Sequence, residues 1–107
     1  MKYVMFYEPA DDFLPKARRY GAAHRARLEQ FHARGLLLLA GPLLDPMDGS
    51  AMGVFTSREA AEGFVSGDPF MLHGVVRSRR IRQWDEFLDR PDDQSISGAP
   101  ATLERPR

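Results

Sequence analysis

The residue with the clearest chemical potential is a histidine in the middle of a predicted helix. His24 lies on the apolar side of that helix, one turn after Tyr20 and one turn before Leu28, so its ring is expected to face a sheet. Two interpretations stay open. The ring can be a core histidine bonded to a backbone carbonyl, or a general acid/base in a cleft, because histidine ordinarily changes charge near neutral pH.

The second candidate is Asp68, in the segment Gly67-Asp68-Pro69-Phe70. Its side chain can be explained as a helix N-cap, since the proline that follows suits the first turn of a helix. A carboxylate beside a histidine can also orient the imidazole and stabilise its charged form. We therefore expect Asp68 to approach His24 from the loop after the second helix, as a His–Asp pair.

Four arginines within six residues mark the last predicted strand: Arg77, Arg79, Arg80 and Arg82. They are expected to alternate between solvent and acidic partners such as Asp85, Glu86 and Asp89. Arg77 and Arg79 are also candidates for a clamp that binds a substrate carboxylate or phosphate. Nucleic-acid binding is the weaker interpretation, because no aromatic platform accompanies these arginines.

Three further residues are candidates for substrate binding. Gly41 and Pro42 end the second predicted strand and could line the mouth of a pocket. Tyr7 shares a strand face with Tyr3 and Met5, an arrangement that more often belongs to a core than to a pocket.

The sequence predicts neither a metal site nor a cofactor. His24, His32 and His73 lack the spacing of metal ligands, and the chain has no cysteine. His32 is expected at the boundary of its helix and His73 at the surface. No glycine-rich nucleotide motif, nucleophile elbow or zinc-protease motif is present.

Composition narrows the class of protein. The chain has 107 residues, enough for one domain, with 43% hydrophobic and 28% charged residues, close to globular averages. Fifteen basic residues balance fifteen acidic ones, so net charge favours neither nucleic acid nor a membrane surface as a partner. The absence of cysteine fits a reducing compartment, and the N-terminus does not resemble a signal peptide. We expect a cytoplasmic protein.

The pattern of the chain predicts four strands and two main helices. Helical periodicity runs from about Phe13 to Arg34, where Gly35 is a natural stop, and Asp12 could cap its start. Thr56-Ser57-Arg58-Glu59 is a capping box for the second helix, whose inward residues are expected to be Ala60, Ala61, Phe64 and Val65. Strands are expected at 2–7, 36–40 (buried), 51–55 and 75–84. One extra helical turn is expected from Asp68-Pro69 through Leu72.

This order, β-α-β-β-α-β, predicts an α+β ferredoxin-like fold: an antiparallel four-stranded sheet with two helices on one face. The domain is expected over residues 1–88, followed by a C-terminal tail at 89–107. From Asp92 the tail is too polar to form a core, so its order would require contact with the body or with a partner subunit.

The same residues resemble the YciI-like (YCII-related) family. His24-x-x-x-Leu28, followed by the run from Gly35 through Leu37 and Leu38 to Gly41-Pro42, is similar to its signature. The second helix of the family is similar to the segment Glu59-Ala60-Ala61 with Phe64. Its "D-P-[FY]…G" element is similar to Asp68-Pro69-Phe70 with Gly74. The similarity spans about residues 2–86, including the last strand at Ile81–Trp84. In one respect this chain departs from the family, because Gly21 occupies a position where many members carry arginine.

The resemblance implies a homodimer whose sheets pack into an α+β barrel, and an enzyme whose histidine–aspartate pair corresponds to His24 and Asp68. One member group is known as a dehydrochlorinase. We therefore expect a cofactor-free lyase, isomerase or hydrolase of a small molecule, with neither nucleic acid nor membrane as partner. The alternative is a non-enzymatic ligand-binding or accessory homodimer, for which His24 would be sealed and bonded to backbone. If another cation takes over the role of the arginine that many members carry at position 21, an arginine of the last strand could supply it.

Overall fold

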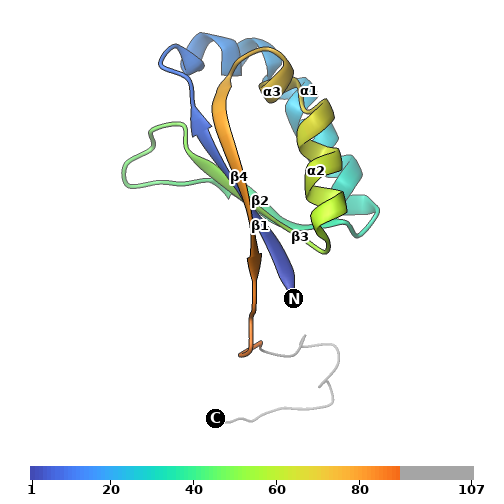
Figure 1. Ribbon diagram of the computed structural model, residues 1–107. Coiled ribbons are helices and arrows are strands. Elements are labelled where there is room, and N and C mark those ends of the chain that lie inside the picture. The colour runs from blue at the N-terminus through green and yellow to red at the C-terminus, as the bar shows by residue number, and fades with distance from the viewer. Residues whose placement is uncertain (90–107) are drawn as a thin grey trace, which may run out of the picture.

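The computed structural model describes residues 1–89 and consists of one sheet with helices on a single face (Figure 1). The order of elements is the one predicted: β1 (Lys2–Pro9), α1 (Phe13–Ala33), β2 (Leu37–Pro42), β3 (Ala51–Phe55), α2 (Arg58–Gly67), α3 (Pro69–Leu72) and β4 (Val76–Trp84). The predicted tail lies outside the described residues apart from Asp89.

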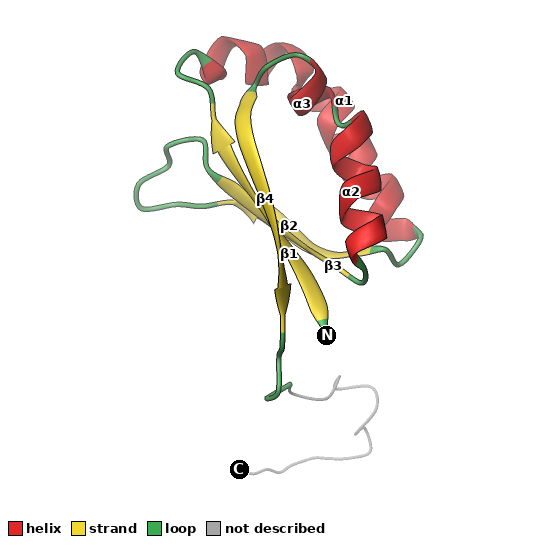
Figure 2. Cartoon of the chain, viewed as in Figure 1, coloured by secondary structure: helices red, strands yellow, loops and turns green. Residues whose placement is uncertain are grey.

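The sheet has the strand order β2-β3-β1-β4, and every neighbouring pair is antiparallel. β1 is therefore central, which is why Val4, Met5 and Tyr7 are all buried. Successive side chains of a strand point to opposite faces. Met5 and Tyr7 join the core beneath the helices, whereas Val4 lies on the opposite face, which no helix covers (Figure 2).

Helix α2 packs as its periodicity predicted, with Ala60, Ala61, Phe64 and Val65 buried against the sheet. The expected capping box is displaced by one residue. Ser57, rather than Thr56, is the N-cap, and its hydroxyl accepts a hydrogen bond from the backbone N–H of Ala60 at 3.0 Å. Two adjacent hydroxyl residues offer the same cap, and the extended conformation of Ser57 decides between them.

Helix α1 ends as predicted, because Gly35 adopts a positive φ of 75°. At its start, Asp12 occupies the N-cap position as predicted, but its side chain makes no capping hydrogen bond and pairs instead with Lys16 at 3.2 Å. Phe31 is the one residue of α1 that is buried. The rest of the inward stripe of α1 is only partly buried. No helix in the described part of the chain is long and apolar enough to cross a bilayer.

Strand β2 corrects a second expectation. A buried strand was predicted from its run of leucines, but β2 forms the edge of the sheet and pairs only with β3. Leu37 is buried, whereas Leu39 is 68% exposed. Proline is tolerated on edge strands, so Pro42 at the end of β2 fits this position.

Candidate active site

Asp68 occupies the junction of two helices. Its backbone ends α2, and its carboxylate caps α3 by accepting a hydrogen bond from the backbone N–H of Phe70 at 3.1 Å. Pro69 follows in the first turn of α3, as the sequence predicted. Asp68 is fully buried. Its carboxylate does more than cap a helix, because both of its oxygens have further hydrogen-bond partners.

The structure brings His24 and Asp68 together. Nδ1 of His24 lies 2.7 Å from Oδ1 of Asp68, which is hydrogen-bond distance. The side chain of His24 is 18% exposed, so it is neither sealed in the core nor freely solvated. Phe70 stacks on the imidazole with ring centroids 3.8 Å apart and planes 3° from parallel. Two residues from the α2–α3 junction therefore fix the ring that α1 presents.

Tyr7 forms the third part of this cluster. Its hydroxyl donates a hydrogen bond to Oδ2 of Asp68 at 2.5 Å, from a position that is 4% exposed. Burial, and then the hydrogen bond with Asp68, raises the pKa of Tyr7 above its ordinary value, so the phenol keeps its proton. The ring lines the cavity described below, whereas the hydroxyl is bonded to Asp68. The sequence did not predict this hydrogen bond.

These contacts determine which nitrogen of His24 carries hydrogen. An ionised carboxylate can only accept, so with Asp68 ionised the hydrogen between Asp68 and His24 is assigned to Nδ1. Neutral His24 then has its basic lone pair on Nε2. Within residues 1–89 no protein group forms a hydrogen bond with Nε2, which leaves this atom for a ligand.

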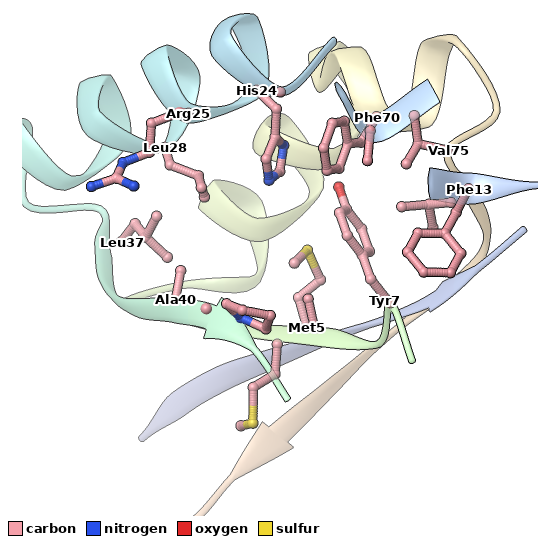
Figure 3. Close-up of a pocket in the computed structure, with 18 of the residues that line it drawn as sticks. Met5, Tyr7, Phe13, His24, Arg25, Leu28, Leu37, Ala40, Phe70 and Val75 are labelled. Carbon is pink, nitrogen blue, oxygen red and sulfur yellow. The ribbon is translucent and has the colours of Figure 1, made fainter. Parts of the chain in front are cut away.

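His24 opens onto a cavity of about 790 Å³ between α1 and the sheet (Figure 3). The helices contribute His24, Leu28 and Phe70 to its wall, and the sheet contributes Met5, Tyr7, Leu37 and Ala40. Gly41 and Pro42, predicted at the mouth of a pocket, also line it. Much of the inward stripe of α1 thus lines a cavity, and Phe31 at its C-terminal end belongs to the core. Such a mostly apolar cavity with a few polar groups is typical of small-molecule sites.

The two arginines proposed as a clamp do not line this cavity. Arg77 lies near Glu8 and Asp11, at 3.0 and 3.6 Å, and Arg79 pairs with Glu62 at 2.8 Å. The strand alternation was right, but their acidic partners are not those that the sequence suggested. Because β4 is the edge strand farthest from β2, its arginines lie at the other side of the sheet.

Three polar residues of the cavity wall were not predicted as site residues. Arg25 and Glu29 were not considered as candidates, and His32 was expected only at the boundary of its helix. The helical period could have grouped them, since Arg25, Glu29 and His32 are spaced i, i+4 and i+7 and form one row on α1 next to the row of His24. Gly21 also lines the cavity, with no atom within 4 Å of where a Cβ would lie. His73 is exposed, as predicted, and stacks on Tyr20 with ring centroids 3.9 Å apart.

A metal ion has no evident ligand set here. Among residues 1–89, no three His, Asp or Glu side chains come together as a metal centre would require. The polar groups of the cavity are imidazole, phenol, guanidinium and carboxylate, a set suited to proton transfer and to binding charged groups.

Known proteins support the same architecture. The chain is 36% identical over 98 residues to protein YciI of Escherichia coli O6:H1 and of Shigella flexneri, an alignment that covers 82% of this chain and all of each relative. Its fold is similar to 5-chloro-2-hydroxyhydroquinone dehydrochlorinase from Burkholderia phenoliruptrix, solved with 2,5-dihydroxybenzoquinone. That similarity has a TM-score of 0.66 at 22% identity and covers 79% of this chain and 94% of that one.

The family model for the YCII-related domain matches residues 1–85, the region that contains the whole sheet, all three helices and the cavity. The resemblance noted in the sequence is thereby confirmed. This chain belongs to the YCII-related domain family.

Proposed function

We propose that the chain is a small-molecule enzyme in which His24 moves a proton and Asp68 orients the imidazole. One observation carries the proposal: His24 is bonded through Nδ1 to a buried carboxylate, and its ring faces a cavity of about 790 Å³. A histidine retained only for packing would satisfy its polar atoms on backbone. Here its partner is a carboxylate that is itself bonded to Tyr7 and to the backbone of Phe70.

The proposed chemistry is general acid/base catalysis. Nε2 of His24 accepts a proton from a C–H or O–H group of a bound substrate, and the imidazolium that forms is stabilised by Asp68 at Nδ1. Nε2 then returns the proton to a leaving group, to another atom of the substrate, or, after water has been activated, to a hydrolysis product. These outcomes correspond to lyase, isomerase and hydrolase reactions. Each needs only proton transfer, so the proposal involves no cofactor.

The comparison with the dehydrochlorinase supports an enzyme of small molecules, since that protein shows that this fold can hold such an activity. The alternative was a ligand-binding or accessory protein with a sealed His24. The partly exposed ring and its carboxylate partner favour the enzyme.

A substrate-independent experiment tests the hydrogen-bond arrangement. Nitrogen-15 NMR of histidine side chains should show neutral His24 with its hydrogen on Nδ1, and Asp68→Asn should disturb that preference. A His24 that carries its hydrogen on Nε2 in the unmodified protein would contradict the proposed role of Nε2 as the base.

Turnover tests the function itself. Halogenated and hydroxylated aromatic compounds form a rational first panel, with release of protons and halide as the readout. For a compound that is turned over, His24→Ala should lower kcat by about 100-fold or more, the scale of general acid/base catalysis. Asp68→Asn should reduce it less, and His73→Ala, a histidine outside the cavity, should leave it unchanged. Full activity in folded His24→Ala would refute the proposal.

We also propose that the functional unit is a homodimer formed through the helix-free face of the sheet. By strand alternation and register, this face carries a cluster of apolar side chains beside Arg80 and Arg82 of β4: Val4, Phe6, Leu39, Met52 and Val54. An apolar cluster of this size without a covering layer is unfavourable in water, so a second copy is the expected cover. We expect the dimer to bury more than about 1,200 Å² in total, the size of a specific interface.

A further inference from the structure

The charged side chains of the cavity wall gather at one end, beside apolar neighbours such as Leu28 and Leu37. Figure 3 shows Arg25 and Phe13 on opposite sides of His24. Toward the C-terminal part of α1 the wall contains Arg25, Glu29 and His32, whereas toward its N-terminus it contains Phe13 and Leu14, with Gly49 close to Phe13. The charged side chains that line the cavity are therefore all at one end. A ligand that fits this gradient is itself polar at one end only.

Arg25 is placed to bind the polar end of such a ligand. Its Nε donates to Oε2 of Glu29 at 3.2 Å, and its two terminal nitrogens have no hydrogen-bond partner within the described chain. The guanidinium therefore presents a free edge with the fork geometry that matches a carboxylate. The Arg25–Glu29 pair is exposed, with side chains 75% and 67% accessible, so holding the pair together contributes little and does not block this edge.

We propose that Arg25 is the anion-binding residue of the cavity and that the ligand is a small organic anion with an apolar body. Its carboxylate, phenolate or sulfonate group contacts Arg25, and its body extends past His24 toward Phe13. That this ligand is the substrate rests on the proposed function. That Arg25 binds an anion does not depend on it.

Glu29 makes the sign of the ligand charge testable. Its carboxylate lies beside Arg25 and opposes an anion at the same end of the cavity. Removing that charge should strengthen binding of an anion and weaken binding of a cation. His32, at the same end, offers a further ring nitrogen to a polar group.

Two dyes with the same ring system provide the probes: 8-anilinonaphthalene-1-sulfonate is anionic, and N-phenyl-1-naphthylamine lacks the sulfonate. In fluorescence titrations, Arg25→Gln should weaken binding of the anionic dye about three- to tenfold, the effect of losing one charge-assisted contact near the surface. Binding of the neutral dye should not change. Glu29→Gln should tighten binding of the anionic dye.

Matched controls locate the effect. Arg18→Gln removes an exposed arginine of α1 that does not line the cavity, and it should change neither dye. Gly21→Leu should fill the cavity from its helical wall and weaken both dyes, since open space surrounds that position.

Equal losses for the two dyes in Arg25→Gln, or the same loss in Arg18→Gln, would overturn the proposal. So would anionic-dye binding that survives Gly21→Leu. His24→Ala separates the two proposals: discrimination between the dyes should persist in that variant, whatever happens to turnover.

Discussion

Replacing Tyr7 with phenylalanine removes a single oxygen from the centre of the site. The ring is 4% exposed, and phenylalanine has nearly the same shape, so packing against the core should be retained. The loss falls on Asp68. Its Oδ1 keeps His24 and the backbone of Phe70, whereas Oδ2 loses the donor that the structure gives it. Asp68 is fully buried, so water cannot readily replace that donor.

The expected size follows from this burial. A hydrogen bond to a charged group contributes about 1.5–3 kcal/mol, and an unsatisfied buried acceptor retains its full desolvation penalty. In a domain of this size each kcal/mol changes Tm by about 4–8 °C, so Tyr7→Phe should lower Tm by roughly 10 °C.

Thermal unfolding followed by circular dichroism at neutral pH measures this change. Tyr3→Phe is the matched control, because the hydroxyl of Tyr3 accepts an exposed hydrogen bond from Gln83 at 3.1 Å and should contribute little. In an Asp68→Asn background the effect of Tyr7→Phe should differ by about 1 kcal/mol or more, the signature of two residues in one network. A Tm change no larger than that of Tyr3→Phe would refute this reasoning.

Further predictions concern stability and assembly. Gly21→Ala should stabilise the protein by about 0.5–1 kcal/mol in denaturant unfolding, because glycine is unfavourable within a helix and a Cβ here meets no atom within 4 Å; destabilisation would contradict that geometry. The hydrogen bond from Lys2 lowers the pKa of Glu86 from 4.5 to about 2, so the stability that this carboxylate contributes is complete above pH 4.5 and is lost as the pH falls through 2. Glu86→Gln should therefore have a lower Tm than the unmodified protein at pH 5 to 7 and the same Tm near pH 2, and a constant difference would exclude this linkage. Sedimentation at micromolar concentration should show a dimer that Leu39→Asp converts to folded monomers; a monomeric unmodified protein would rule out the proposed interface.

Local patterns predicted most of the fold. The inward set of α2 follows from its helical period, and the turn of α3 follows from Asp68-Pro69, because both depend on residues close together in sequence. The meeting of His24 with Asp68 could also be expected, once both helices were assigned to one face of the sheet. These features need only the order of elements and the direction of each helix face.

Features that depend on distant partners could not be read in this way. Leucine-rich β2 looks like a buried strand, and only the strand order reveals that it forms the edge. Arg77 and Arg79 were placed near a site because of their charge, but their partners Glu8 and Glu62 come from β1 and α2. The hydroxyl of Tyr7 reaches a carboxylate 61 positions away, a contact that no spacing in the sequence encodes.

The hollow beneath α1 has a practical consequence. In most small domains the inward stripe of a long helix is buried, but here the cavity replaces much of that contact and Phe31 is the one buried residue of the helix. A molecule that fills the space therefore adds packing that the free fold lacks. Ligand bound at 100 times its Kd stabilises a protein by about 2.7 kcal/mol, which a melting curve resolves easily. Amide hydrogen exchange along the middle of α1 should slow when such a molecule binds, so libraries of metabolites can be screened for natural ligands before any reaction is known.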